Sequence, residues 1–182
     1  VLVEYAPELD VQITNTDVTV VPPSQIAVAY SDGKFPAVKG EGVRDGILAC
    51  FQMISLYLGI KYRRETVQRI VDMQLERNNR ATLQLCAAIA EVLGLMGRLM
   101  DIPANQICRI QNPAIIAWED SFAVIYQVND KEIVLGTPQS GVEKIKIERF
   151  ISLFGDAHTP IQVLLLLETK NVQRQKFDLA WF

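Results

Sequence analysis

Three cysteines and a single histidine are the side chains of this 182-residue chain that could support nucleophilic chemistry. A thiol attacks a carbonyl efficiently only as a thiolate, and a nearby histidine usually takes up its proton. The only histidine, His158, follows Phe154-Gly155 in a predicted loop, and no cysteine has a sequence frame that matches it. We therefore interpret His158 as a solvated loop residue and not as a catalytic base.

The cysteines are also unsuited to metal binding or to a disulfide framework. Their number is odd, and neither a CxxC pair nor a Cys/His spacing typical of zinc occurs. Their apolar neighbours favour reduced, buried thiols at Cys50, Cys86 and Cys108. We predict neither a metal site nor a bound cofactor.

The composition is that of one ordinary globular domain. The formal charge is −3 and the pI is near 5.2, which leaves no electrostatic footprint for nucleic acid or for an anionic membrane. The strongest apolar run, Val163–Leu167, is far shorter than the roughly 20 residues of a transmembrane helix. No Gly-x-x-x-x-Gly-Lys-Ser/Thr loop for nucleotide phosphates is present. The chain begins at Val1 and stops at Trp181-Phe182, so we expect a domain cut from a longer protein.

Hydrophobic periodicity predicts three helices in the first half of the chain. The first, 46–58, is apolar on nearly all sides, as a central buried helix would be, and Gly59 is a suitable stop. The second spans 65–76. The third spans 82–95, with Thr82 as its N-cap and Gly94 or Gly97 as its stop.

After Pro103 the apolar period changes to two, which is typical of strands. A polar turn at 129–131 predicts a hairpin, and 144–154 is expected to turn from a strand into a short helix. The remaining candidate strands are 18–21, 25–30, 114–117, 121–128, 132–135 and 163–167. Helices followed by an antiparallel sheet indicate an α+β fold.

One predicted helix resembles a known active-site helix. Its sequence is Asp45-Gly46-Ile47-Leu48-Ala49-Cys50-Phe51-Gln52-Met53-Ile54-Ser55-Leu56-Tyr57. This is similar to Asp-Cys-Gly-x-x-Cys-Leu-x-Met-Ile-x-x-Tyr, the signature of the double-glycine leader peptidases. These are papain-like cysteine peptidase domains at the N-terminus of bacterial ABC exporters. The resemblance covers roughly Phe35 to Leu167 and implies a papain-like fold, with N-terminal helices packed on a C-terminal antiparallel sheet.

The chemical positions of that family carry other residues here, although the surrounding frame is kept. Gly46 stands where the nucleophile is expected, and Gly40 where the oxyanion glutamine is expected. The family's His-Phe-Val-Val strand matches 121–126, so Ser121 replaces the base. Its Asp-Pro-x-x-Gly turn matches 137–141, so Thr137 replaces the orienting aspartate.

The resemblance therefore implies a degenerate domain that is not an enzyme. Its role would be to recruit or position the polypeptide exported by a bacteriocin or type I secretion transporter. Degenerate domains of haemolysin-type systems are similar in binding that polypeptide without cutting it. Two alternatives stay open: the domain gates the transporter without touching cargo, or Cys50 acts as a replacement nucleophile. The expected burial of Cys50 argues against the second, because a buried thiol stays protonated.

Aromatic residues near the expected cleft are candidates for contacting the polypeptide. These substrate-binding candidates are Trp118, Phe122 and Tyr126. Plain core packing is the alternative for Phe122 and Tyr126.

The resemblance also implies a context. Residues 1–35 would be an N-terminal extension of unassigned role, 36–170 the peptidase-like domain, and 171–182 a linker to an absent transmembrane domain. Expected partners are the exported polypeptide and the transmembrane and nucleotide-binding domains of the same transporter, which would be a homodimeric ATPase; no nucleic acid is expected. The expected location is the cytoplasmic face of the bacterial inner membrane.

Overall fold

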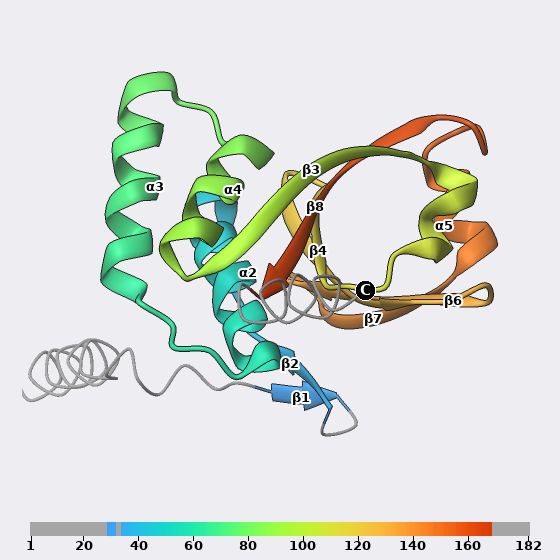
Figure 1. Cartoon of the computed structure of the whole chain (residues 1–182), viewed down its shortest axis with the longest axis horizontal. Helices are drawn as coiled ribbons and strands as arrows, with labels where there is room; N and C mark the ends of the chain where they lie inside the picture. Colours follow the sequence, from blue (N-terminus) through green and yellow to red (C-terminus); the bar gives the residue numbers. More distant parts are fainter. Residues whose placement is uncertain (1–28, 32–33, 169–182) are drawn as a thin grey trace, which may run out of the picture.

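The computed structural model describes residues 29–31 and 34–168, which form a two-stranded ribbon, four α-helices, one 3-10 helix and a six-stranded sheet (Figure 1). The elements in chain order are β1 (Ala29–Ser31), β2 (Phe35–Ala37), α2 (Gly42–Leu58), α3 (Arg64–Asn78), α4 (Leu83–Val92), β3 (Leu95–Pro103), η2 (Ala104–Arg109), β4 (Ala114–Trp118), β5 (Ser121–Val128), β6 (Glu132–Thr137), β7 (Gly141–Lys146), α5 (Ile147–Leu153) and β8 (Pro160–Glu168). The predicted α+β class is confirmed.

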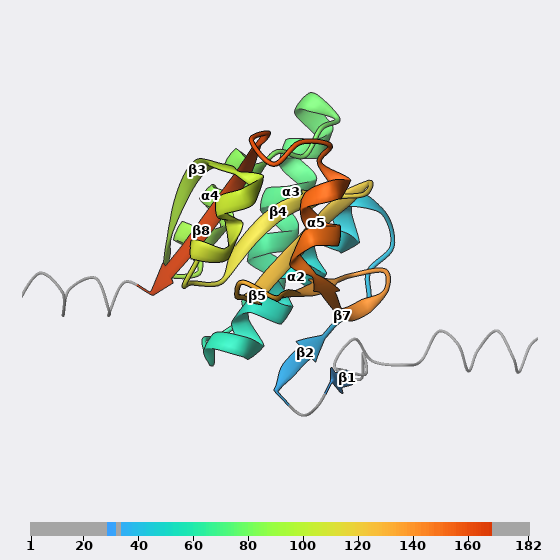
Figure 2. The same cartoon turned by 90° about the vertical axis from the view of Figure 1, so that its right-hand side faces the viewer.

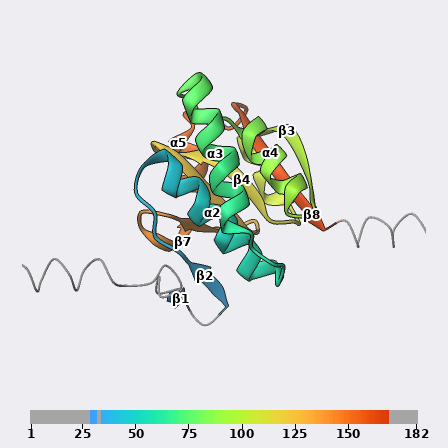
Figure 3. The ribbon, with the colours of Figure 1, turned by 90° about the vertical axis from the view of Figure 1, so that its left-hand side faces the viewer.

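The six-stranded sheet separates two hydrophobic cores. Its strand order is β3-β8-β4-β5-β6-β7, and every neighbouring pair is antiparallel. Because side chains alternate between faces, Phe122 and Val124 of β5 join the core under α2, α3 and α4, whereas Ala123 and Ile125 join the core under η2 and α5. Figure 2 shows α5 in front of the sheet with α2 and α3 behind it, and Figure 3 shows the helical face.

Helix α2 is the central helix of the domain, as its apolar sequence predicts. Nine of its residues are buried, from Gly46 to Ser55, so its contacts extend around most of its circumference. It begins four residues earlier than the prediction, at Gly42, and ends at Leu58 as predicted; Gly59 follows in the left-handed conformation expected of a C-terminal glycine.

The second predicted helix and the start of the third also match the structure. Helix α3 carries one buried stripe, with Val67 and Val71 at its centre, and the rest of its surface faces outward. Helix α4 is capped by Thr82, whose Oγ1 accepts a hydrogen bond from the Leu85 N–H at 3.2 Å. The N-cap prediction is confirmed.

The third helix is shorter than predicted, and the strand that follows it was not predicted. Helix α4 ends at Val92, and Gly94 adopts a φ of +82°, which turns the chain directly into β3. This edge strand pairs with β8 over its whole length, from Leu95 to Pro103. Most of its side chains are exposed or half-buried, so the alternation that signals a strand is missing from its sequence.

The predicted strands on the C-terminal side are confirmed, with β6 and β8 extending slightly beyond them. Asn129 Oδ1 accepts hydrogen bonds from the N–H groups of Lys131 and Glu132, which closes the predicted hairpin. The predicted strand-to-helix segment is β7 followed by α5. The candidate strand at 18–21 and the tail at 171–182 lie outside the described residues, and only the end of the 25–30 candidate falls in β1.

Across residues 29–31 and 34–168, no helix combines the length and the apolar character that crossing a bilayer requires.

We predict that Thr82→Ala lowers the free energy of unfolding by about 1 kcal/mol, because the Leu85 N–H loses its acceptor. Urea denaturation of the full chain would measure the change. Thr82→Ser keeps a hydroxyl at the N-cap and serves as the control. Equal stability of the two variants would show that the cap contributes nothing.

Candidate functional site

Two of the positions singled out in the sequence meet at the start of α2. Gly46 lies in the second turn of that helix, and Ser121 is the first residue of β5. A Cβ built on Gly46 would collide with Ser121 Oγ and would lie 3.2 Å from Ser121 Cβ and 4.0 Å from Pro138 Cγ. The Ser121 hydroxyl therefore fills the space that any side chain at position 46 would need.

Gly40 joins the same cluster through its backbone. Its N–H donates a hydrogen bond to the Pro138 carbonyl oxygen at 3.0 Å, which ties the segment before α2 to the turn between β6 and β7. A Cβ at position 40 would collide with the carbonyl oxygen of Asp45 and lie 2.7 Å from its carbonyl carbon. Because these are backbone atoms, a side chain at position 40 would require the chain to move.

Thr137 completes the cluster as a residue that shapes a turn. Its Oγ1 donates to the Gly141 carbonyl oxygen at 3.1 Å and accepts from the Ser140 N–H at 3.0 Å. The side chain is buried, and Gly141 has a φ of +84° that favours glycine. Both hydrogen-bonding functions of the Thr137 hydroxyl are thus used within the turn.

The Ser121 hydroxyl has no hydrogen-bond partner among the described residues. Ser121 is only 9% exposed, and its Oγ is enclosed. Leaving a buried hydroxyl unsatisfied costs about 1–3 kcal/mol. The hydroxyl is therefore held at Gly46 by packing and not by a polar contact.

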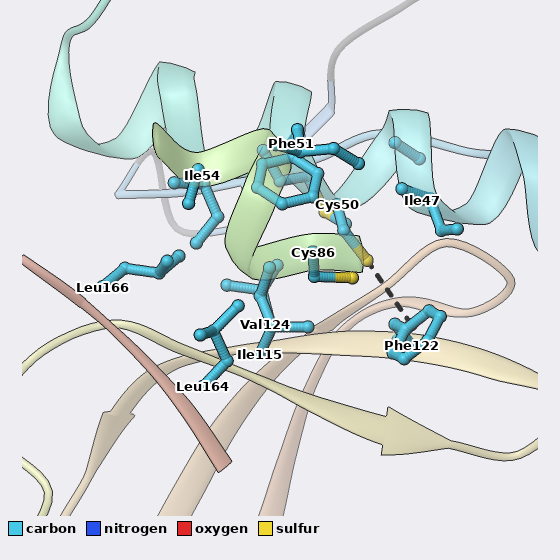
Figure 4. Packing of buried hydrophobic residues seen from close by; sticks show 14 of the residues in the cluster. Ile47, Cys50, Phe51, Ile54, Cys86, Ile115, Phe122, Val124, Leu164 and Leu166 are labelled. Atoms are coloured by element: carbon cyan, nitrogen blue, oxygen red, sulfur yellow. Dashed lines mark hydrogen bonds between the residues drawn. The ribbon is translucent and has the colours of Figure 1, made fainter. Parts of the chain in front are cut away.

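Cys50 lies one helical turn after Gly46, on the buried face of α2 (Figure 4). Its thiol donates to the Phe122 carbonyl oxygen at 3.5 Å. Burial raises the pKa of the Cys50 thiol well above its usual value, and the nearby Cys86 thiol raises that pKa further. A thiol in this environment is protonated and a poor nucleophile.

His158, Cys86 and Cys108 are the remaining thiol and imidazole candidates. His158 is exposed in the loop before β8, where its backbone N–H donates to Asp156 Oδ1 at 3.3 Å. Cys86 is buried, as predicted, but Cys108 is half-buried, so the expectation of three buried thiols is wrong for Cys108. Cys108 lies in η2, whose buried positions are Ala104 and Ile107, three residues apart on one side of the helix, so Cys108 is off the buried side. The part of the chain that the structure describes holds no group of three or more His, Cys, Asp or Glu residues that could hold a metal ion.

The structure does not bring the three aromatic candidates onto one surface. Phe122 and Tyr126 are buried in the core under α2, where the Tyr126 hydroxyl donates to the Pro36 carbonyl oxygen at 2.5 Å. Trp118 lies on the opposite face of the sheet and stacks on Phe150, with 5.8 Å between ring centroids. Their role in binding a polypeptide stays a prediction.

A surface groove that sequence reasoning missed opens beside the cluster. Its volume is about 720 Å³, and its walls come from the loop before α4, the turn between β4 and β5, and the start of β8. Ser121, Phe122 and Val43 connect this groove to the start of α2. The lining residues carry no shared motif, because they come from segments that only the fold brings together.

Comparison with known proteins identifies the chain's relatives. A family model described as the Peptidase C39 family matches residues 34–162. A double glycine motif protease from an AMS/PCAT transporter, crystallised in complex with the leader peptide, is 20% identical to this chain. That match covers 75% of this chain and 93% of the other, with a TM-score of 0.57.

A second solved structure is the N-terminal peptidase C39-like domain of a toxin secretion ATP-binding protein from Vibrio parahaemolyticus. It is 16% identical, covers 68% of this chain and 97% of that chain, and has a TM-score of 0.49. No curated protein matches the chain.

The matched region contains Gly40, Gly46, Ser121 and Thr137, together with the helices and strands β2 to β7. The similarity to the transporter protease shows a shared fold, so the expected papain-like architecture is confirmed. The chain belongs to the Peptidase C39 family.

Proposed function

We propose that this domain binds the polypeptide exported by a bacterial ABC transporter and does not cut it. The observation that carries the proposal is the contact between Gly46 and Ser121. The resemblance of the sequence assigns the nucleophile to position 46 and the base to position 121. Neither residue can perform its assigned step, because glycine has no attacking atom and a serine hydroxyl is a poor proton acceptor at neutral pH.

The remaining two positions support the same proposal. Gly40 has no side chain that could donate to an oxyanion, and a side chain there would strike the backbone of Asp45. Thr137 uses both functions of its hydroxyl inside its own turn, so it is not available to orient a histidine. All four positions are therefore occupied in ways that favour a stable scaffold over the chemistry of a thiol peptidase.

A replacement nucleophile is also disfavoured. Cys50 is the nearest thiol, but its Sγ is buried against the Phe122 carbonyl and its pKa is raised. His158 is exposed in the loop before β8, where its backbone N–H donates to Asp156. A peptidase built around Cys50 would lack both a thiolate and a base.

Retention of the fold without its chemistry favours a binding role. The related transporter protease was crystallised with its leader peptide. In this chain a groove of about 720 Å³ remains open beside Ser121, where a polypeptide could lie next to the inactive cluster. In the full transporter we place the domain at the cytoplasmic face of the inner membrane, next to transmembrane and nucleotide-binding domains that form a homodimeric ATPase.

We predict that the full chain binds a fluorescein-labelled synthetic peptide that carries a double-glycine leader, and leaves it intact. Fluorescence anisotropy would measure binding, and mass spectrometry after overnight incubation would measure cleavage. Binding without cleavage is the expected result, because no activated nucleophile is present. Cleavage after the double glycine would overturn the proposal in favour of a peptidase, and absence of binding would favour a role in gating the transporter.

We predict that Cys50 is inert toward alkylation in the folded chain from pH 7 to 8. Its raised pKa keeps the thiolate population far below that of an ordinary cysteine, which titrates near 8.5. Reaction with iodoacetamide followed by peptide mass mapping should modify the half-buried Cys108 first, whereas Cys50 and Cys86 should react only in denaturant. Fast modification of Cys50 in the native chain would reopen the peptidase alternative.

We also predict energetic coupling between positions 46 and 121. Gly46→Ala alone should destabilise the chain, because its methyl group would collide with Ser121 Oγ, even though alanine favours a helix. Ser121→Ala alone should be neutral or stabilising, since it removes an unsatisfied hydroxyl.

In the double variant much of the collision is gone, so urea denaturation should give a coupling energy of about 1 kcal/mol. Ser140→Ala, whose residue lies in the neighbouring turn and contributes a backbone N–H, serves as a control that should be additive with Gly46→Ala. Additive effects of Gly46→Ala and Ser121→Ala would show that the hydroxyl does not occupy the space at position 46.

A further inference from the structure

The last residues of β5 lie at a gap in the sheet. Strand β4 begins at Ala114, which pairs with Ile125, whereas β5 continues to Val128. The chain before Ala114 leaves the sheet at Pro113, whose carbonyl oxygen accepts from the Leu166 N–H at 2.9 Å. The end of β5 therefore has β6 on one side and no strand of the described chain on the other.

The hydrogen-bond pattern shows which backbone groups face this gap. Asn129 N–H donates to the Glu132 carbonyl oxygen at 3.0 Å, so Asn129 faces β6. Main-chain groups alternate between the two sides of an antiparallel strand, and Val128 pairs with Ile133 in the same ladder. The N–H and C=O of Val128 consequently point away from β6, toward the gap.

A pocket occupies the gap, and we call it the β5 edge pocket. It has a volume of about 720 Å³ and is lined by residues 125–129, by residues 108–113 and by Tyr57. Strand β5 carries a bulge between Ile125 and Gln127, which bends the strand end at this point. A free strand edge beside a pocket is the arrangement that accepts an added strand.

The charged side chain that lines this pocket is a cation, which favours a negatively charged ligand. Arg109 is exposed, lines the pocket, and makes no ion pair among the described residues. No Asp or Glu lines the pocket, although the chain as a whole has a formal charge of −3. Amide side chains such as Gln111 and Gln127 supply the remaining polar contacts. The surroundings therefore favour a peptide that brings a carboxylate.

We propose that the β5 edge pocket binds an extended segment of the exported polypeptide, which pairs with Val128 and places an acidic side chain against Arg109. This inference rests on the proposed function, since it takes the exported polypeptide as the occupant. Strand β5 runs from Ser121 to Val128, so the pocket and the cluster at Gly46 lie roughly 20–25 Å apart. An extended segment of about seven residues spans that distance, so one polypeptide reaches both.

The test uses variants of the full chain and the same fluorescein-labelled double-glycine leader peptide, extended at its C-terminus by an acidic sequence. Val128→Pro removes the N–H that faces the pocket but spares the ladder to β6, and Val128→Ala is its control. Arg109→Gln removes the charge, and Arg149→Gln on α5 is its control. We expect Val128→Pro and Arg109→Gln each to raise the Kd at least about fivefold, with the controls unchanged.

Cys108 gives an independent readout that needs no substitution in the strand. It is the half-buried cysteine among residues that line the pocket, so a saturating amount of peptide should slow its modification by N-ethylmaleimide at least about fivefold. This readout keeps the inference testable if Val128→Pro fails to fold.

Two negative results can be distinguished. Tight binding of the peptide with unchanged affinity in Val128→Pro and Arg109→Gln, and with Cys108 unprotected, would overturn the β5 edge pocket and leave the proposed function intact. Absence of any peptide binding to the unaltered chain would overturn the proposed function, and this inference with it.

Discussion

The close approach of α2 to the start of β5 is the constraint on which the rest of the structure depends. Helix α2 is buried on nearly every side, so it must fit against the sheet without gaps or collisions. At Gly46 this fit is possible only because the helix carries no side chain there, and the Ser121 hydroxyl takes the space. The Gly40–Pro138 hydrogen bond then fixes the segment that leads into the helix.

The close approach buries the Ser121 hydroxyl, which lowers the stability of the folded state. The enclosed Ser121 hydroxyl finds no partner among the described residues, and such orphaned groups are uncommon in stable domains. Burial of α2 between the helices and the sheet offsets that cost, because large apolar side chains such as Ile47, Phe51 and Ile54 are fully buried. The result is a rigid scaffold in which surface features, and not a reactive thiol, are available for function.

Prediction from the sequence succeeded where local patterns are strong. The apolar circumference of α2, the Thr82 cap and the Asn129 turn each depend on neighbouring residues, so all three were found at the right positions. Strand β3 was missed, because an edge strand with exposed side chains has no clear alternation. Trp118 does not share a face of the sheet with Phe122 and Tyr126, because it pairs with Ser121 across β4 and β5, and Phe122 is the next residue after Ser121 and lies on the other face.

By itself the sequence determined which residue types stand at positions 40, 46, 121 and 137, and that the frame around them is kept. Residue identity and order are properties of the sequence and do not depend on how the chain folds. Only the tertiary structure decided that Ser121 fills the space at Gly46 and that β5 ends at an open pocket. Such contacts join segments far apart in the chain, and their geometry is set by how the helices and strands pack.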